Sequence, residues 1–297
     1  MTGARPALLR SVLYTPGHDA ERIAKAPRYG ADALCLVLED SVPVALKDRA
    51  REVTASAIET LAAAGHTVLV KINALDEGGL EDVARIARPG LAGLIVPKLR
   101  EPADLERVDA AVGAAESRAG VAPGAIGLLP LVETPRAAYY AFGLAEASPR
   151  VLALIAGTAA NGDMARELGF RATPEGSERL YLRSKLVLDA RAAGVPWPLD
   201  GVYADVRDID GLVAEAERVR DLGYRGKLVV HPSHVEPVNR VFTPSADEVA
   251  EQRRVLEAFE QAVEAGTAAA VVDGRFVDYA MAKTARAVIE LAERAPR

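Results

Sequence analysis

Eight short apolar runs recur along the chain, and each closes on a polar or turn residue. Runs that are almost continuously apolar are typical of strands buried on both faces, as in parallel sheets. The runs are SVLYTPG (11–17), ALCLVLED (33–40), TVLVKIN (67–73), GLIVPK (93–98), GLLPLVET (127–134), VLALIAG (151–157), PLDGVYAD (198–205) and GKLVVHP (226–232).

Most consecutive runs are separated by a stretch with helical periodicity. Eight buried strands with intervening helices are the layout of a (β/α)8 barrel. The pattern therefore predicts an α/β fold, a TIM barrel, over residues 1–235. The helical stretches are 19–29, 46–65, 77–88, 102–119, 136–148, 175–193 and 208–223.

Residues 236–297 exceed what such a barrel needs after its last strand. Their pattern predicts a Ser-capped helix over about 245–265, a small hairpin in AAAVVDGRFVD and a final helix over about 279–294. We expect a C-terminal helical extension that packs on its own barrel, covers the mouth of the barrel or reaches a neighbouring subunit.

Composition and charge narrow the class of protein. Half of the residues are hydrophobic, 26% are charged and the net charge is −6. Without a basic stripe, no nucleic-acid partner is expected. No apolar run approaches the roughly 18 residues that span a bilayer, and the N-terminus does not resemble a signal peptide. The sequence thus predicts a cytoplasmic protein with no membrane contact, and Cys35 is interpreted as a buried structural thiol.

The residues that close the apolar runs are the first candidates for chemistry, because a barrel collects its functional groups at the C-terminal ends of its strands. They are Glu39, Asp40, Lys71, Asn73, Lys98, Glu133 and His231. Asp163 follows the sixth run in the loop GTAANGD. Any one acid alone is explained by capping of a helix. Glu133 and Asp163 together favour Mg2+, which is commonly held by two carboxylates and several waters.

The basic candidates leave more than one interpretation open. Lys71 and Lys98 could pair with a substrate carboxylate, form an ion pair within the mouth, or form a Schiff base if their pKa were lowered. His231 and His234 are three residues apart, but no third soft ligand is evident, so zinc is disfavoured and contact of His231 with substrate is the preferred interpretation.

A series of motifs covers nearly all of residues 10–292. The motifs are RSVLYTPG with Lys25 downstream, LVLEDSVPVALKDRAR, VKINALD, IVPK, PLVETPRA, NGDMARELG, ARAAGVPWPLDGVYADVRD, GKLVVHPSHVEPVNRVFTPS and GRFVDYAMAKTAR. Together, and in this order, they resemble the citrate lyase β-subunit-like branch of the HpcH/HpaI aldolase superfamily. The resemblance implies a TIM barrel that makes or cleaves a carbon–carbon bond between an acyl-CoA and a 2-oxo acid, as citryl-, malyl- and citramalyl-CoA lyases do.

The same resemblance implies roles for individual residues. Mg2+, with Mn2+ as an alternative, would be held by Glu133 and Asp163. Asp278 would enter a neighbouring subunit's site as acid and base, which implies a homo-oligomer, a trimer or a hexamer. Contacts with substrate or with the coenzyme A thioester would come from Tyr14, Lys25, Lys71 and Glu133, with Glu39 and Asp40 behind them.

The chain departs from the family pattern at three places. Lys71 replaces the usual arginine, Val37 replaces an acid, and the loop before Asp163 is two residues longer. Lysine keeps the charge but lacks the planar fork that grips a carboxylate. Three alternatives therefore stay open: an aldolase of free 2-oxo acids without CoA, a Schiff-base aldolase, and a non-catalytic subunit or scaffold.

Overall fold

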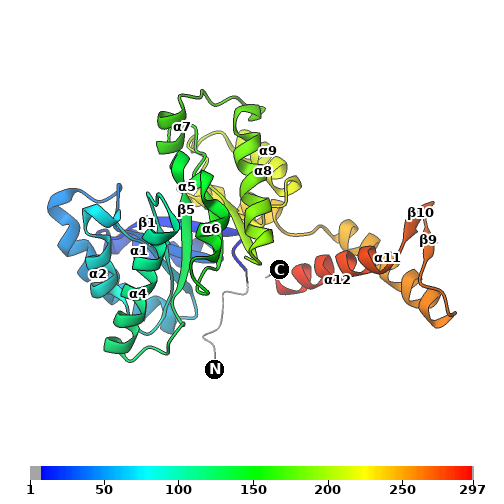
Figure 1. Ribbon diagram of the computed structural model, residues 1–297, viewed down its shortest axis with the longest axis horizontal. Helices are drawn as coiled ribbons and strands as arrows, with labels where there is room; N and C mark the ends of the chain where they lie inside the picture. The colour runs from blue at the N-terminus through cyan, green and yellow to red at the C-terminus, as the bar shows by residue number, and fades with distance from the viewer. Residues whose placement is uncertain (1–7, 296–297) are drawn as a thin grey trace. The chain divides into compact units, whose positions relative to one another are not determined.

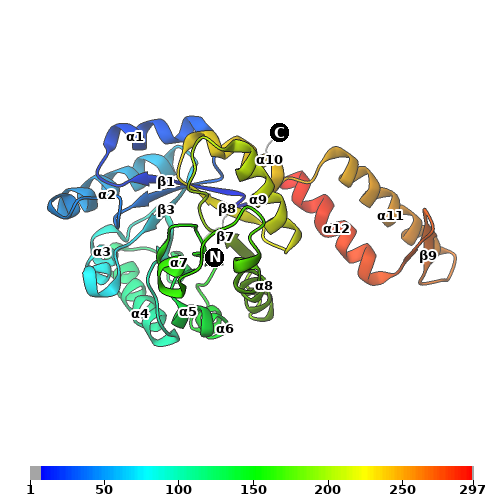
Figure 2. The ribbon, with the colours of Figure 1, turned by 90° about the horizontal axis from the view of Figure 1, so that it is seen from above.

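The computed structural model describes residues 8–295, and its larger part is a closed barrel of eight parallel strands in sequential order (Figures 1 and 2). The expected TIM barrel is confirmed. The strands are β1 (Ser11–Pro16), β2 (Ala33–Val37), β3 (Thr67–Lys71), β4 (Leu91–Val96), β5 (Gly127–Val132), β6 (Ala153–Ala156), β7 (Trp197–Asp200) and β8 (Gly226–Val229).

Helices surround the barrel, as the view in Figure 2 shows. They are α1 (Ala20–Lys25), α2 (Lys47–Ala63), α3 (Gly79–Ile86), α4 (Pro102–Ala119), α5 (Pro135–Tyr139), α6 (Ala141–Glu146), α7 (Asp163–Leu168), α8 (Ser177–Ala192), α9 (Ile209–Asp221) and α10 (Val235–Val241). Short 3-10 turns occur at Ala26–Tyr29, Val44–Leu46, Leu75–Glu77 and Pro232–His234.

Local sequence explains why these elements form where they do. Every residue of β2 and of β5 is buried, which matches the near-continuous apolar runs. Helix α4 begins with Pro102 after a capping box formed by Glu101 and Asp104, and it ends at Gly120 in the left-handed region. The bounds predicted for this helix are those observed.

Two predicted helical details were wrong. The single helix expected over residues 136–148 is two helices, α5 and α6, because the backbone of Tyr140 leaves the helical region (φ −94°, ψ 16°). Asp163, expected in a loop, is the first residue of the short helix α7, which Gly162 precedes and Gly169 ends in the left-handed region. The six residues of α7 are too few for a clear periodic signal.

The parallel register aligns the C-terminal ends of neighbouring strands. Val37, the last residue of β2, is paired with Lys71 of β3, and Lys71 is paired with Ile95 of β4. Val96 is in turn paired with Pro130 of β5. Side chains just beyond these ends are thus gathered on one rim of the barrel.

The chain divides into two compact units, the first ending at Arg240 and the second beginning at Val241. The second unit contains α11 (Ala246–Glu264), the antiparallel hairpin of β9 (Ala270–Val272) and β10 (Arg275–Val277), and α12 (Tyr279–Arg294). Its small core includes Phe259, Val277 and Ala282. Within residues 8–295, no helix is long and apolar enough to cross a membrane.

Candidate active site

A buried carboxylate at the end of β2 joins two lysines from neighbouring strands. Glu39 is 1% exposed. Its carboxylate forms an ion pair with Lys71 of β3, and Oε1 lies 3.2 Å from Nζ of Lys98, which follows β4. Nζ of Lys98 also lies 3.4 Å from Oδ1 of Asp40. These four residues, which were predicted because they close apolar runs, therefore lie together in the structure.

Both lysines stay charged in this environment. Burial works against the ammonium ion of Lys71, but Glu133 and Glu39 outweigh it and raise its pKa. Partial burial likewise opposes the charge of Lys98, while Glu39 and Asp40 raise its pKa. Because a Schiff-base lysine needs a lowered pKa, this geometry disfavours that alternative.

Glu133, the residue after β5, presents a carboxylate that is nearly enclosed. It is 8% exposed, and Oε1 accepts a hydrogen bond of 3.0 Å from the backbone N–H of Lys98. Burial raises the pKa of Glu133 to about 7; Lys71 opposes the shift, and Glu39 and Asp163 add to it. A bound cation would stabilise the ionised form of this side chain.

Asp163 contributes the second carboxylate near Glu133. Its side chain forms an ion pair with Arg166 one turn along α7. Among residues 8–295, no group of three or more histidine, cysteine or acidic side chains could hold a metal. Two carboxylates completed by water suit Mg2+, which keeps much of its hydration shell, and do not suit a zinc site with four protein ligands. The donor chemistry of Glu133 and Asp163 thus fits magnesium.

Tyr14 on β1 connects this cluster to a neighbouring cavity. Its ring centroid lies 5.9 Å from Nζ of Lys71, and its hydroxyl is buried without a hydrogen-bond partner among the described residues. Burial, with nearby Cys35 and acidic groups, raises the pKa of Tyr14. The hydroxyl is therefore a protonated donor that the described part of the chain leaves for a ligand.

The cavity beside Tyr14 has a volume of about 310 Å3 and also holds Lys25 and His231 at its wall. Lys25 is exposed and forms an ion pair with Glu21 of the same helix. Nδ1 of His231 lies 2.7 Å from Oγ of Ser233. These two predicted substrate contacts thus line the β1–β8 side of the rim, apart from the Glu39–Lys71–Lys98 ion pairs.

A second cavity of about 370 Å3 lies against the carboxylate side of the rim. Asp163 and Lys98 line it together with both basic and acidic side chains. Arg136 there is held 2.6 Å from Oε2 of Glu101. The predicted site thus faces two cavities, one beside Tyr14 and one beside Asp163.

Sequence reasoning missed Gly157, the residue directly after β6. A Cβ atom at this position would lie 2.3 Å from Cβ of Glu133 and 2.8 Å from its Cα. Only glycine leaves room for the backbone of Glu133 at this point. The signal in the sequence was a glycine closing an apolar run, which is equally typical of an ordinary turn.

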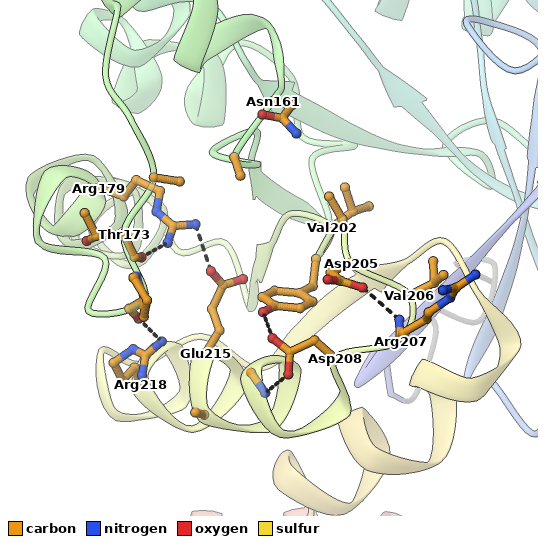
Figure 3. Close-up of a pocket in the computed structure, with 17 residues that line it drawn as sticks. Asn161, Thr173, Arg179, Val202, Asp205, Val206, Arg207, Asp208, Glu215 and Arg218 are labelled. Atoms are coloured by element: carbon orange, nitrogen blue, oxygen red, sulfur yellow. Dashed lines mark hydrogen bonds and ion pairs between the residues drawn. The ribbon is translucent and has the colours of Figure 1, made fainter.

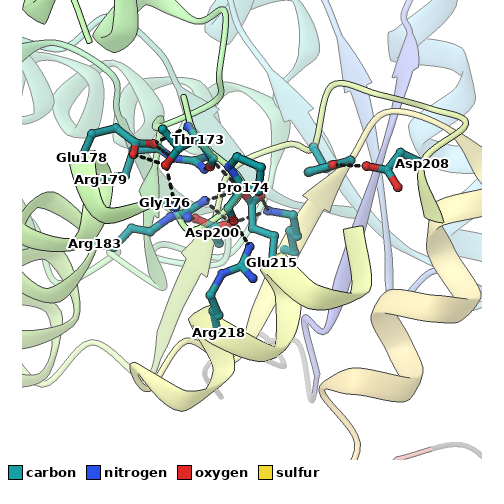
Figure 4. A network of polar contacts seen from close by, with 12 residues as sticks. Thr173, Pro174, Gly176, Glu178, Arg179, Arg183, Asp200, Asp208, Glu215 and Arg218 are labelled. Carbon is teal, nitrogen blue, oxygen red and sulfur yellow. Dashed lines mark hydrogen bonds and ion pairs between the residues drawn. The ribbon is translucent and has the colours of Figure 1, made fainter. Parts of the chain in front are cut away.

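A larger cavity, of about 790 Å3, lies between the loops that follow β6 and β7 (Figure 3). Charged side chains line it, but several are engaged with one another or with the backbone. Arg179 donates to Oε2 of Glu215 at 2.8 Å, and Arg218 donates to the carbonyl oxygen of Pro174. These contacts belong to the network in Figure 4, which ties the loop after β6 to α8 and α9.

Asp278, the expected acid and base, lies in the second unit as the N-cap of α12. Its Oδ1 accepts hydrogen bonds from the backbone N–H groups of Ala280 at 2.9 Å and Met281 at 3.2 Å. This contact gives Asp278 a structural role in starting the helix. Its expected role in a neighbouring subunit stays a prediction.

A match to a known protein family shows what this chain is related to. A family model described as HpcH/HpaI aldolase/citrate lyase matches residues 10–232. The chain belongs to this family. Its resemblance to the family, expected from the motifs, is confirmed, and membership places the chain among CoA-related lyases and thioesterases.

Individual relatives of the family extend this match across both units. The citrate lyase subunit beta of Escherichia coli K12 is 33% identical over 285 residues, covering 96% of this chain and 93% of that protein. A (3S)-malyl-CoA thioesterase of Cereibacter sphaeroides KD131 is 37% identical over 289 residues, covering 96% and 94%. The structure of CitE from Mycobacterium tuberculosis with magnesium, acetoacetate and coenzyme A has a TM-score of 0.74, 26% identity, and coverage of 98% and 100%.

Proposed function

We propose that the protein is a Mg2+-dependent carbon–carbon lyase that cleaves or forms a β-hydroxyacyl-CoA, such as malyl-, citramalyl- or citryl-CoA. The products of cleavage are an acyl-CoA and a 2-oxo acid. The observation that carries the proposal is the nearly enclosed carboxylate of Glu133. One of its oxygens accepts a hydrogen bond from the backbone, and the buried ammonium ion of Lys71 lies close enough to interact with its charge. This combination suits a cation and an anionic substrate together.

The donor set supports a role for magnesium in this family member. Glu133 and Asp163 would hold the ion, with water completing its coordination. Bound there, Mg2+ would lower the pKa of the substrate hydroxyl group and polarise the carbonyl group of the oxo acid. The magnesium in the related CitE structure is consistent with this assignment.

The side chains around the carboxylates would bind and orient the substrate. Lys71 would attract the carboxylate of the oxo acid and offset the charge that develops during cleavage. Because Glu39 pairs with this lysine, its ammonium ion is restrained beside the rim. Tyr14 would donate its hydroxyl, which has no hydrogen-bond partner among residues 8–295, to an oxygen of the ligand. The cavity that Tyr14 shares with Lys25 would receive part of the CoA thioester.

Cleavage also requires two proton transfers. The carboxylate of Asp278 from a neighbouring subunit would accept the proton of the β-hydroxyl group as the carbon–carbon bond breaks, leaving the 2-oxo acid and the enolate of the thioester. The protonated Asp278 would then deliver this proton to the enolate carbon, so that no proton is gained or lost overall. A positioned acid of this kind contributes about 10²–10⁴-fold to the rate.

The proposal is tested by turnover of malyl-, citramalyl- and citryl-CoA with Mg2+ and with EDTA. We expect one thioester to be cleaved by the native chain and EDTA to abolish the reaction. Asp278→Asn should lower kcat by about 10²-fold or more, because asparagine still caps α12 but cannot donate a carboxyl proton. Asp273→Asn in the β9–β10 turn is the matched control and should keep native activity. Failure of the folded protein to turn over any thioester would refute the proposal.

A second candidate is thioester hydrolysis, favoured by the 37% identity to the (3S)-malyl-CoA thioesterase. Hydrolysis releases free CoA and an intact hydroxy acid, whereas lyase cleavage releases an acyl-CoA and a 2-oxo acid. The same reaction mixtures therefore separate the two activities by their products.

A further inference from the structure

Lys98 adopts a backbone conformation that is unusual for a residue with a side chain. Its φ is 51°, and among residues 8–295 only Asp273, at 49°, is another non-glycine residue with positive φ. Asp273 belongs to the turn of the β9–β10 hairpin, where an aspartate in this conformation is ordinary. A lysine is disfavoured in this left-handed conformation, and backbone strain of this kind is found most often at functional sites.

The left-handed turn connects the exits of β4 and β5 at two points. The N–H of Lys98 donates to Oε1 of Glu133 at 3.0 Å. One residue later, the carbonyl oxygen of Leu99 accepts a hydrogen bond of 2.8 Å from the hydroxyl of Thr134. The second oxygen of Glu133, Oε2, accepts no hydrogen bond from the described residues. The turn thus restrains one oxygen and leaves the other for a ligand.

The side chain of Lys98 adds a separate connection. Its Nζ lies 3.2 Å from Oε1 of Glu39, whose other oxygen pairs with Lys71. One carboxylate, that of Glu39, therefore faces two ammonium ions and cannot neutralise both. A glycine would adopt this turn without strain, so the presence of lysine points to a use for its ammonium ion.

We propose that Lys98 is the positioning residue of this site: its backbone orients Glu133, and its ammonium ion keeps part of the charge of Lys71 available by sharing Glu39. The inference rests on the proposed function. It assigns Lys98 two separable effects, one on the affinity for Mg2+ and one on the affinity for the anionic oxo acid.

Two substitutions separate the backbone from the side chain. Lys98→Gly keeps the N–H and the turn but removes the ammonium ion. Lys98→Val also removes the ammonium ion, but a β-branched residue resists positive φ. Binding of Mg2+ to the substrate-free protein, measured by titration calorimetry, should stay within about threefold of native for Lys98→Gly and fall by about tenfold or more for Lys98→Val.

The ammonium ion is tested on Lys98→Gly alone, where the turn is intact. KM for the 2-oxo acid in the condensation direction should rise by about tenfold, because Lys71 then pairs with Glu39 undivided. Lys98→Arg should recover much of this loss, since it returns a cation. Asp273→Gly and Asp273→Val form the matched control pair for backbone strain, and both should bind Mg2+ with native affinity.

Two outcomes would overturn the inference. Equal Mg2+ affinity of the Gly and Val variants would remove the backbone role, and a native KM for Lys98→Gly would remove the ammonium role. If Lys98→Val does not fold, Lys98→Ala replaces it, with the same direction expected. A native protein that neither binds Mg2+ nor turns over a thioester would refute the proposed function instead, so the two failures are distinguishable.

Discussion

The position of the Glu133 carboxylate depends on two neighbouring residues, one of which has no side chain. Gly157 approaches its backbone so closely that any side chain would displace it, and the N–H of Lys98 restrains Oε1. A nearly enclosed carboxylate with a raised pKa is a typical functional group in a barrel enzyme. The position of the Glu133 side chain thus depends on contacts between the C-terminal ends of three strands, β4, β5 and β6.

Gly157→Ala should therefore impair the site. The added Cβ would lie 2.3 Å from Cβ of Glu133, so the two strand ends must separate. We expect the affinity for Mg2+ to fall by about tenfold or more and the free energy of unfolding to fall by about 1–3 kcal/mol. Calorimetric titration and urea denaturation measure these changes.

Gly113→Ala is the control, because a Cβ there meets Arg150 only at 3.7 Å. Alanine in the interior of α4 should leave Mg2+ binding unchanged and increase stability by up to about 1 kcal/mol. Native Mg2+ affinity in Gly157→Ala would contradict the role given to this glycine.

Cys35 provides a pH-dependent prediction at the same scale. Burial raises the pKa of its thiol to about 12, although Lys71 opposes the shift. In the unfolded chain the thiol ionises near pH 9. Its ionisation therefore does not change the free energy of unfolding below about pH 8, and it lowers this free energy as the pH rises from about 9 to 12.

The native protein should lose about 2 kcal/mol more stability between about pH 8 and pH 10.5 than Cys35→Ala does. Urea denaturation of both proteins at the two pH values measures the difference. A thiol reagent at about pH 8 should modify Cys35 only after unfolding, and rapid reaction with the folded protein would contradict the complete burial of this thiol.

Between elements, buried ion pairs join β7 and β8 to the helices outside them. Lys227 of β8 is 0% exposed, forms an ion pair with Asp200 and lies 2.9 Å from Oε1 of Glu215 in α9. Arg183 of α8 donates to both oxygens of Asp200, at 3.0 and 3.1 Å. Burial opposes the charge of Glu215, but Lys227 and Arg183 outweigh it and lower its pKa. Figure 4 shows this network of charged side chains.

Lys227→Met should lower the free energy of unfolding by about 3–5 kcal/mol, because removal of one member of a buried network leaves its partners incompletely paired. Arg240→Met, which breaks an exposed pair with Glu236, is the control and should cost less than about 1 kcal/mol. Thermal and urea denaturation of both variants measure these changes in the free energy of unfolding. Equal, small effects would show that the buried pairs do not stabilise the barrel.

Much of this element arrangement could be predicted from the sequence, because buried parallel strands leave near-continuous apolar runs and helices leave a periodic one. The break in the helix at Tyr140 and the six-residue helix that begins at Asp163 were not predicted, because short elements show little periodicity. For the site, the strand-end rule selected Glu39, Lys71 and Glu133. The effects of Gly157 and of the backbone of Lys98 arise from close approaches between strands, which a linear pattern does not record.

For the whole molecule, the central question is whether one chain contains a complete site. Asp278 belongs to the unit that begins at Val241, while Glu133 belongs to the barrel unit. We propose that Asp278 acts in the site of a neighbouring subunit in a homo-oligomer. In that arrangement each site consists of the barrel of one copy and the extension of another.

Mixing two inactive variants tests this arrangement. Glu133→Gln and Asp278→Asn should each lose nearly all activity alone. Mixed oligomers from co-expression in equal amounts should recover about a quarter of native activity, because half of the barrels and, independently, half of the extensions are intact. No recovery in purified mixed oligomers would contradict a shared site, and light scattering establishes that the oligomers form.

The proposed lyase reaction breaks a carbon–carbon bond, so the identity of the products tests the proposal. The native protein with Mg2+ is given malyl-, citramalyl- or citryl-CoA, and acyl-CoA, 2-oxo acid and free CoA are quantified over the first turnovers. We expect acyl-CoA and 2-oxo acid in equal amounts from one of these thioesters, with no free CoA. Release of free CoA together with the intact hydroxy acid would contradict the proposal.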